Sequence, residues 1–234
     1  MAGETTKTEA ICLDIRPWSR TSHIVRWMTP EGPVTTVVKG AVRPKSAFLG
    51  QYDLNYTCEI VYYSRARGEL HALRECSPLS TRDSLRSSYR ALVLAEYMRS
   101  QTAALAPHGS ESEPWLAALA DALDSLCASA AHSPRRLVAA LLGFELVVLD
   151  LSGLSPGIEA ESGAFSLRGE RQMPISNDVA RCINDPGSEK NMQILVDAAR
   201  AIGVFYTFHL DSAPEIRRSV LRMISNNEEG KQDG

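Results

Sequence analysis

The sequence lacks the motifs that nucleotide-hydrolysing and metal-dependent enzymes require. It contains no P-loop, no G-x-G-x-x-G loop and no H-E-x-x-H motif, and its five histidines show no metal-ligand spacing. Its carboxylates are scattered along the chain, so they suggest no acid–base pair. We therefore expect a protein with no enzymatic activity and no cofactor.

The cysteines also indicate neither metal binding nor redox chemistry. There are five, an odd number, and no two of them form a Cys-x-x-Cys pair. This pattern supports neither a zinc site nor a redox motif. We expect buried, reduced thiols in a cytosolic protein.

Long apolar segments are also missing. The longest apolar run, residues 137–151, is too short to span a bilayer and contains Glu145 and Asp150. The first residues have no apolar core of the kind found in a signal peptide. We expect a soluble cytoplasmic protein with no membrane partner.

One catalytic motif matches in sequence but lacks the structural context that its chemistry requires. Residues 153–157 match the G-x-S-x-G elbow of serine hydrolases. However, the segment follows an amphipathic helical pattern rather than a strand, and Pro156 has no N–H for an oxyanion hole. We interpret Gly153 as a helix terminator.

Charge is divided unevenly along the chain. The formal net charge is −3, but residues 1–90 contain thirteen Lys and Arg against nine Asp and Glu, a net charge of +4. Residues 91–234 contain twelve against nineteen, a net charge of −7. An anion-binding surface would therefore belong to the N-terminal part.

Five short segments with alternating apolar residues predict five β-strands before residue 77. They share β-branched or aromatic content and are mostly bounded by turn residues. The predicted strands cover residues 11–15, 23–28, 34–39, 56–63 and 70–76. A small closed barrel of the OB-fold type removes the sheet edges that five such strands would otherwise expose.

From residue 77 the apolar spacing becomes helical. Residues 80–83 resemble a capping box before a first helix at 85–98, and further helices are expected near 112–126, 134–151, 192–205 and 214–223. We therefore predict an α+β protein with a five-stranded OB-fold DNA-binding domain at 1–80 and an all-helical domain at 81–225. The helical domain would contain an irregular, cysteine-free insert at about 153–174, and residues 226–234 would form a disordered tail.

Basic residues interleaved with aromatics are the strongest functional signal. Loops at the ends of OB-fold strands line a groove in which cations contact phosphates and aromatic rings stack on bases. The predicted DNA-contacting cations are Arg16, Arg20, Lys39, Arg43, Lys45, Arg65 and Arg67. The possible stacking rings are Trp18, Phe48 and Tyr52, although each ring could instead seal the barrel end or pack against the helical domain.

A second hypothesis places function in the helical part. The protein would then be a protein–protein adaptor whose helical domain binds an acidic partner tail, while the barrel is structural. The candidate acceptors are Arg135, Arg136, Arg217, Arg218 and Arg222. Solvation of a helix face or pairing with a helix C-terminus would explain any one of them equally well.

Several segments resemble the bacterial recombination mediator family RecO. Residues 32–46 contain the family's strand followed by a K-G-A-x-R-P-K-S loop, here beginning at Lys39. Residues 8–13, 68–73 and 144–149 also resemble family segments, in the same order. The resemblance is strong over residues 8–76 and thin after residue 155.

This resemblance implies an N-terminal OB-fold, a helical C-terminal domain and binding of single-stranded and double-stranded DNA without nucleotide hydrolysis. It also implies annealing of complementary strands, action with RecR and with the C-terminal tail of single-strand-binding protein, and help in loading RecA during gap repair at the nucleoid. The DNA-contacting loop would contain Lys39, Arg43 and Lys45, with Arg16 and Arg20 as weaker additions.

The sequence departs from the family pattern at two places. Many relatives carry four zinc-binding cysteines after the third helix, but residues 159–174 contain none. We therefore expect no metal site. Val42 also stands where a basic residue is frequent in the family, which should slightly weaken phosphate contact.

Overall fold

The computed structural model describes residues 4–64, 70–109, 112–128, 133–154, 156, 158–159, 164–168, 171–209 and 216–226. The chain divides into two compact units. The barrel unit comprises residues 1–83 and 99–124, and the helical unit comprises residues 84–98 and 125–234. Helices α1 and α2 therefore contribute residues to both units.

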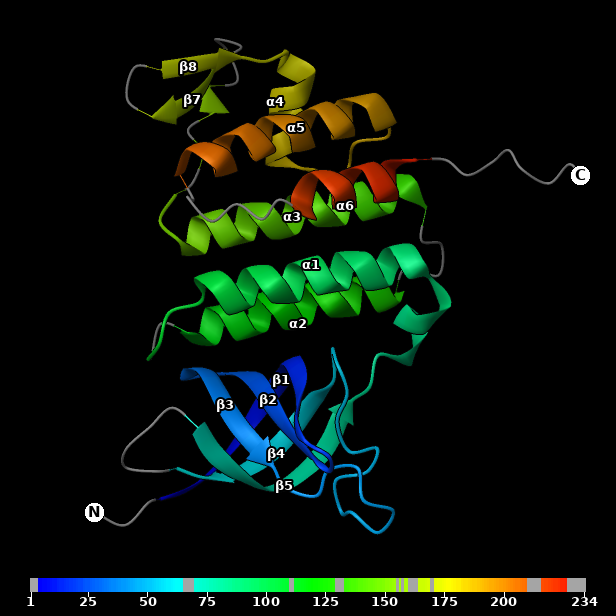
Figure 1. Ribbon diagram of the computed structural model, residues 1–234. Coiled ribbons are helices and arrows are strands. Elements are labelled where there is room, and N and C mark those ends of the chain that lie inside the picture. Colours follow the sequence, from blue (N-terminus) through cyan, green and yellow to red (C-terminus); the bar gives the residue numbers. More distant parts are fainter. Residues whose placement is uncertain are drawn as a thin grey trace, which may run out of the picture. The chain divides into compact units, whose positions relative to one another are not determined.

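The barrel unit contains a closed five-stranded barrel (Figure 1). Its strands are β1 (Thr5–Ser19), β2 (Ser22–Thr29), β3 (Gly32–Val38), β4 (Thr57–Tyr63) and β5 (Leu70–Ser80). The order around the barrel is β1-β2-β3-β5-β4, and β3 pairs with β5 in parallel while the other neighbours are antiparallel. The predicted five-stranded OB-type barrel followed by helices is thus confirmed.

The interior of the barrel is filled by aliphatic, cysteine and aromatic side chains. Trp27 is fully buried, and its indole N–H donates a 2.9 Å hydrogen bond to Thr36 Oγ1. Because a buried indole N–H without a partner would destabilise the fold, Thr36 completes the core at this point. The buried core residues are Ala10, Cys12, Val25, Trp27, Val38, Ala41, Cys58, Ile60, Tyr62, Leu73 and Cys76.

Helical segments of the same unit are fastened to the barrel by arginines. Arg26 Nη2 donates a 2.6 Å hydrogen bond to the carbonyl of Ala103, and Arg99 donates to the carbonyl of Leu13. The Arg99 bond is buried and the Arg26 bond is partly buried, so each carbonyl gains a charged donor where water has limited access. Two hydrogen bonds therefore tie the barrel to the C-terminal part of α1 (Tyr89–Leu105), which α2 (Glu113–Ala128) follows in the chain.

The predicted capping box at residues 80–83 is wrong. β5 continues to Ser80, and Arg82 has a left-handed backbone with φ of +50°, which no helical turn accommodates. The Arg82 side chain is buried and donates to Asn55 O, Thr57 Oγ1 and Asp124 Oδ1 at 2.7–2.8 Å. A 3-10 turn (Asp83–Ser87) follows, and Ser88 Oγ accepts from the N–H of Ala91 at the start of α1.

The helical unit contains the remaining helices, whose apolar faces form its core. They are α3 (Pro134–Leu151), α4 (Asn177–Asn184), α5 (Met192–His209) and α6 (Ile216–Ser225). As predicted, α3 begins after Ser133 with Pro134 in its first turn; its last residue is Leu151, and Gly153 follows the C-cap Ser152. Gly153 has φ of +68°, and its N–H and that of Leu154 bond back to Asp150 O and Leu149 O. This is a helix terminator, as the sequence indicated.

Two elements of this unit are absent from the prediction. Residues 153–174 were expected to be irregular, but they contain a small antiparallel sheet. Its strands are β6 (Ile158–Glu159), β7 (Ala164–Arg168) and β8 (Arg171–Pro174). Helix α4 follows, capped by Ser176, whose Oγ accepts from the N–H of Val179 at 3.2 Å.

A buried ion pair joins α3 to α6. Arg217 donates to both carboxylate oxygens of Glu145 at 2.6 Å, and the Tyr97 hydroxyl donates to Glu145 Oε1 at 2.6 Å. Burial raises the pKa of Tyr97, which therefore stays a donor. Arg217 was proposed as an acceptor for a partner tail, but it is only 6% exposed and already paired. That assignment is wrong.

Candidate nucleic-acid interface

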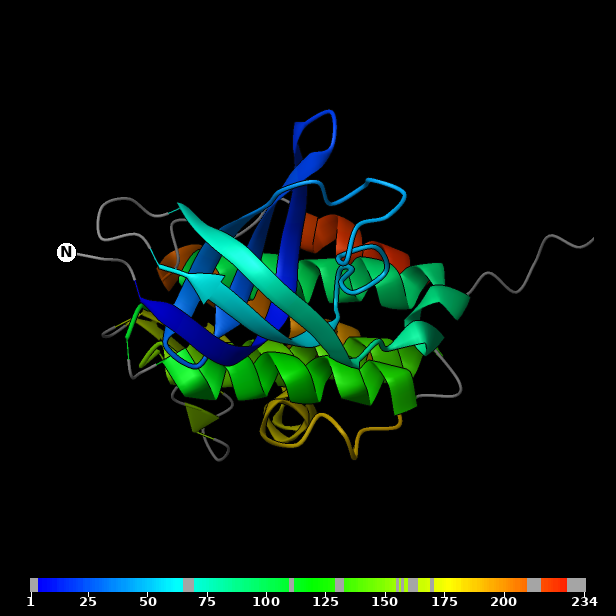
Figure 2. The ribbon, with the colours of Figure 1, turned by 90° about the horizontal axis from the view of Figure 1, so that it is seen from below.

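The predicted DNA loop lies against the turn between β1 and β2. The loop is the connection between β3 and β4, residues 39–56. Its Gly40 N–H donates to Ser22 Oγ at 3.2 Å, and its Val42 N–H contacts Thr21 O at 3.4 Å. Figure 2 shows the β1–β2 hairpin projecting at one end of the barrel, with this loop beside it. Two segments that are distant in sequence therefore share one rim.

This arrangement brings four of the predicted cations together. Arg20 precedes Thr21, Lys39 precedes Gly40, and Arg43 and Lys45 follow Val42. We name Arg20, Lys39, Arg43 and Lys45 the rim cluster. All four side chains are exposed, and no carboxylate among the residues that the structure describes pairs with any of them. Their charges are available to an anion in solvent.

The other three predicted cations differ from the rim cluster. Arg16 lies on β1 opposite Ile24, and its Nε is 2.5 Å from Asp14 Oδ2. Because this pair is exposed, solvent weakens it, but it still places a negative charge beside Arg16. Arg65 and Arg67 lie outside the described residues.

Of the three candidate stacking rings, only Trp18 is exposed, at 61%. The Tyr52 hydroxyl is 2.8 Å from His23 Nδ1, and its ring lies 5.9 Å from the Trp27 ring, edge to face. Burial raises the pKa of Tyr52. Phe48 is partly buried against the barrel core. Packing within the barrel unit accounts for Tyr52 and Phe48 without a ligand, in line with the expectation that a ring could seal the barrel end.

The loop is held at several further points that the sequence did not reveal. Ala41 is 3% exposed and belongs to the barrel core, so it anchors the loop between Gly40 and Val42. The Gln51 carbonyl accepts from the thiols of Cys58 and Cys76 at 3.6 Å each. The barrel interior thus fixes the loop at these points, and the cations of the loop belong to an ordered backbone.

Within the described ranges, no three His, Cys, Asp or Glu side chains gather where they could hold a metal ion. None of the helices that the structure describes is both long and apolar enough to cross a membrane.

Comparison with known families identifies the barrel. Residues 1–82 match the family model "Recombination protein O N terminal". The barrel is a RecO N-terminal domain. The match supports a RecO-family protein and indicates a role in DNA recombination and repair. RecO proteins are recombination mediators and are not known as catalytic enzymes. No curated protein sequence matches this chain.

Proposed function

We propose that this RecO-family protein binds DNA through the rim cluster, anneals complementary single strands and assists recombinase loading during gap repair, without catalysis of its own. One observation carries the proposal. Four exposed cations from two separate segments gather at one end of the barrel, with no carboxylate partner among the described residues. A group of exposed cations of this kind favours contact with a phosphate backbone.

DNA binding and annealing would rest mainly on electrostatics. Lys and Arg that contact phosphates release condensed counterions, and this release drives binding. Neutralising part of the charge on two strands also lowers their mutual repulsion, so complementary bases can meet and pair. Neither step needs a nucleotide or a metal. The exposed Trp18 ring beside the cluster would stack on an unpaired base.

The experiment compares salt dependence in two triple variants of the full chain. Binding to a labelled single-stranded oligonucleotide is measured at several salt concentrations. The plot of log K against log salt has a negative slope, and Lys39→Ala/Arg43→Ala/Lys45→Ala should reduce the size of that slope by about 2. Each phosphate contact in single strands contributes about 0.7.

The matched control removes three exposed cations from the helical unit, Arg181→Ala/Lys190→Ala/Arg200→Ala. This variant loses the same total charge, so its slope should stay at that of the parent protein. Equal slopes for the parent and the rim variant would remove the rim cluster from the DNA site.

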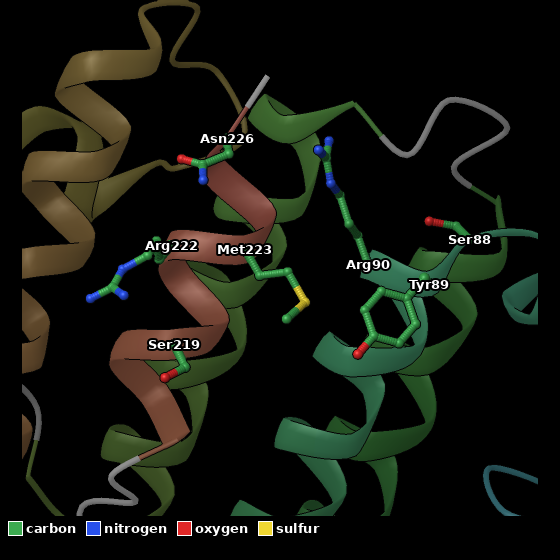
Figure 3. Close-up of a pocket in the computed structure, with 7 residues that line it drawn as sticks. All are labelled: Ser88, Tyr89, Arg90, Ser219, Arg222, Met223 and Asn226. Carbon is green, nitrogen blue, oxygen red and sulfur yellow. The ribbon is translucent and has the colours of Figure 1, made fainter. Parts of the chain in front are cut away.

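A pocket in the helical unit supports a second function. The pocket has a volume of 620 Å³ and lies where α1 and α6 face each other (Figure 3). The Tyr89 ring and the Met223 side chain point toward one another, and Arg90 and Arg222 are the cations of the lining, with the Arg222 guanidinium directed away from Met223. Its lining residues are Ser88, Tyr89, Arg90, Ser219, Arg222, Met223 and Asn226.

We infer that this pocket takes an acidic partner tail with an apolar residue, such as the tail of single-strand-binding protein, alongside the barrel's contact with DNA. Of the expected acceptors, Arg222 lines the pocket, whereas Arg135 donates to Glu189 O. The affinity for a labelled tail peptide, measured by titration, should fall in Arg222→Ala and stay unchanged in Arg218→Ala. Action with RecR and with RecA is proposed on the family resemblance.

A further inference from the structure

Gly40 has a conformation and a position that set it apart within the rim. Its φ is +67°, in the left-handed region that side chains disfavour. Its N–H donates to Ser22 Oγ at 3.2 Å, and its carbonyl accepts from the N–H of Arg43 at 3.1 Å. Gly40 therefore begins a tight turn that ends at Arg43 and is tied to β2.

The Arg43 side chain lies over this glycine. A Cβ atom built on Gly40 would be 3.2 Å from Arg43 Cδ and 3.4 Å from Arg43 Nε. A separation of 3.2 Å is tighter than most carbon contacts, so a Cβ at residue 40 would require the Arg43 stem to move by a few tenths of an ångström. The course of Arg43 thus depends on the missing side chain of Gly40.

The turn itself cannot easily shift to relieve such a contact. Ala41 is buried in the barrel core, and Val42 N–H contacts Thr21 O at 3.4 Å. On the other side of Arg43, its carbonyl accepts from the N–H of Ser46 at 2.9 Å. With both neighbours fixed, a Cβ at residue 40 would displace the Arg43 side chain rather than the backbone.

We propose that Gly40 and Ser22 are positioning residues that hold the Arg43 guanidinium in a fixed direction for a DNA phosphate. This rests on the proposed function, since it assumes that Arg43 contacts DNA. An arginine stem that is already directed loses less side-chain freedom on binding, which strengthens the contact. A displaced stem would contact phosphate in fewer of its conformations.

The first test uses a matched glycine in the same loop. Gly50 also has a left-handed backbone, with φ of +75°, but no atom lies within 4 Å of a Cβ built there. Gly40→Ala and Gly50→Ala therefore introduce similar backbone strain, and only the first meets Arg43. We expect Gly40→Ala to weaken binding of a single-stranded oligonucleotide about two- to tenfold, the effect of ordering one long side chain. Gly50→Ala should leave binding unchanged.

The second test is a double-mutant cycle on the full chain. Gly40→Ala should add nothing to Arg43→Ala, because its effect passes through Arg43, but it should add fully to Lys45→Ala. Ser22→Ala removes the hydrogen bond without adding an atom, and it should likewise be silent in the Arg43→Ala background. If Gly40→Ala fails to fold, two other variants decide the question. Gly40→Asn introduces a residue that tolerates the left-handed backbone better, and Ser22→Ala leaves Gly40 in place.

The outcomes separate this inference from the function on which it rests. If Arg43→Ala alone binds DNA like the parent protein, the proposed DNA site is wrong. If Arg43→Ala weakens binding but Gly40→Ala behaves like Gly50→Ala, or adds its full effect to Arg43→Ala, the positioning role is overturned and the DNA site stands.

Discussion

Arg217 in the helical unit and Arg43 in the barrel unit show two opposite uses of the same side chain. Arg217 is 6% exposed and donates to both oxygens of a fully buried carboxylate, Glu145. Arg43 is exposed at the rim and has no carboxylate partner among the described residues. A guanidinium that is already paired adds structure but no binding capacity, whereas an exposed one without a carboxylate can take a ligand.

The same contrast holds for the wider charge distribution. The first ninety residues, with a net charge of +4, contain the exposed rim cluster as well as the buried Arg82, whereas the buried Arg217 belongs to the acidic remainder of the chain. Because a polyanion is attracted by exposed charge, the barrel is the better candidate for DNA. Three substitutions test this contrast.

The largest effect is expected in the helical unit. Arg217→Ala leaves Glu145 buried without its charge partner, which should destabilise the protein by about 3–5 kcal/mol. Urea unfolding measures this change. Arg218→Ala, an exposed neighbour on α6, is the control and should have little effect. A loss below about 1 kcal/mol for Arg217→Ala would show that the pair is not structural.

A smaller effect is expected at the rim aromatic. Trp18→Ala should weaken binding to single-stranded DNA by about 1–3 kcal/mol through the loss of one base stack. Duplex DNA offers no unpaired base, so its affinity should be unchanged. The control is Leu49→Ala, which removes an exposed apolar side chain from the neighbouring loop. Equal losses for both DNA forms would argue against stacking.

The smallest effect is expected where the barrel pairs a cation. Asp14→Asn releases Arg16 from its carboxylate and removes one negative charge near the rim. DNA affinity should rise about two- to fivefold, in keeping with the modest strength of exposed ion pairs. Asp178→Asn, which breaks a similar exposed pair in the helical unit, should leave DNA binding unchanged. Weaker binding by Asp14→Asn would mean that Arg16 needs its partner.

Much of the fold could be predicted because long periodic segments carry their own signal. The barrel strands and α3 followed from alternation, turn residues and the Pro134 and Gly153 boundaries. β6 to β8 are two to five residues long, which is too short for a period to emerge. Helix α4 could have been found from Ser176 and the apolar spacing of Val179, Ala180 and Ile183.

The site was predictable in part. The cationic loop at Lys39–Lys45 was visible because like charges in a Gly- and Pro-containing turn need solvent or an anion. The pairing of Arg16 with Asp14 and the packing of Tyr52 on Trp27 depend on strand register and on a distant loop, which local sequence does not encode. The left-handed backbone of Arg82 was also not predictable, because the partners of its side chain, Asn55 and Thr57, are distant in sequence.

The most direct measurement is a crosslinking map of the full-length protein on single-stranded DNA, read by mass spectrometry. Crosslinks should concentrate on peptides from residues 16–20 and 39–56, and they should disappear from those peptides as salt rises. Crosslinks confined to residues 125–226, with none at the rim, would contradict the assignment of DNA binding to the barrel.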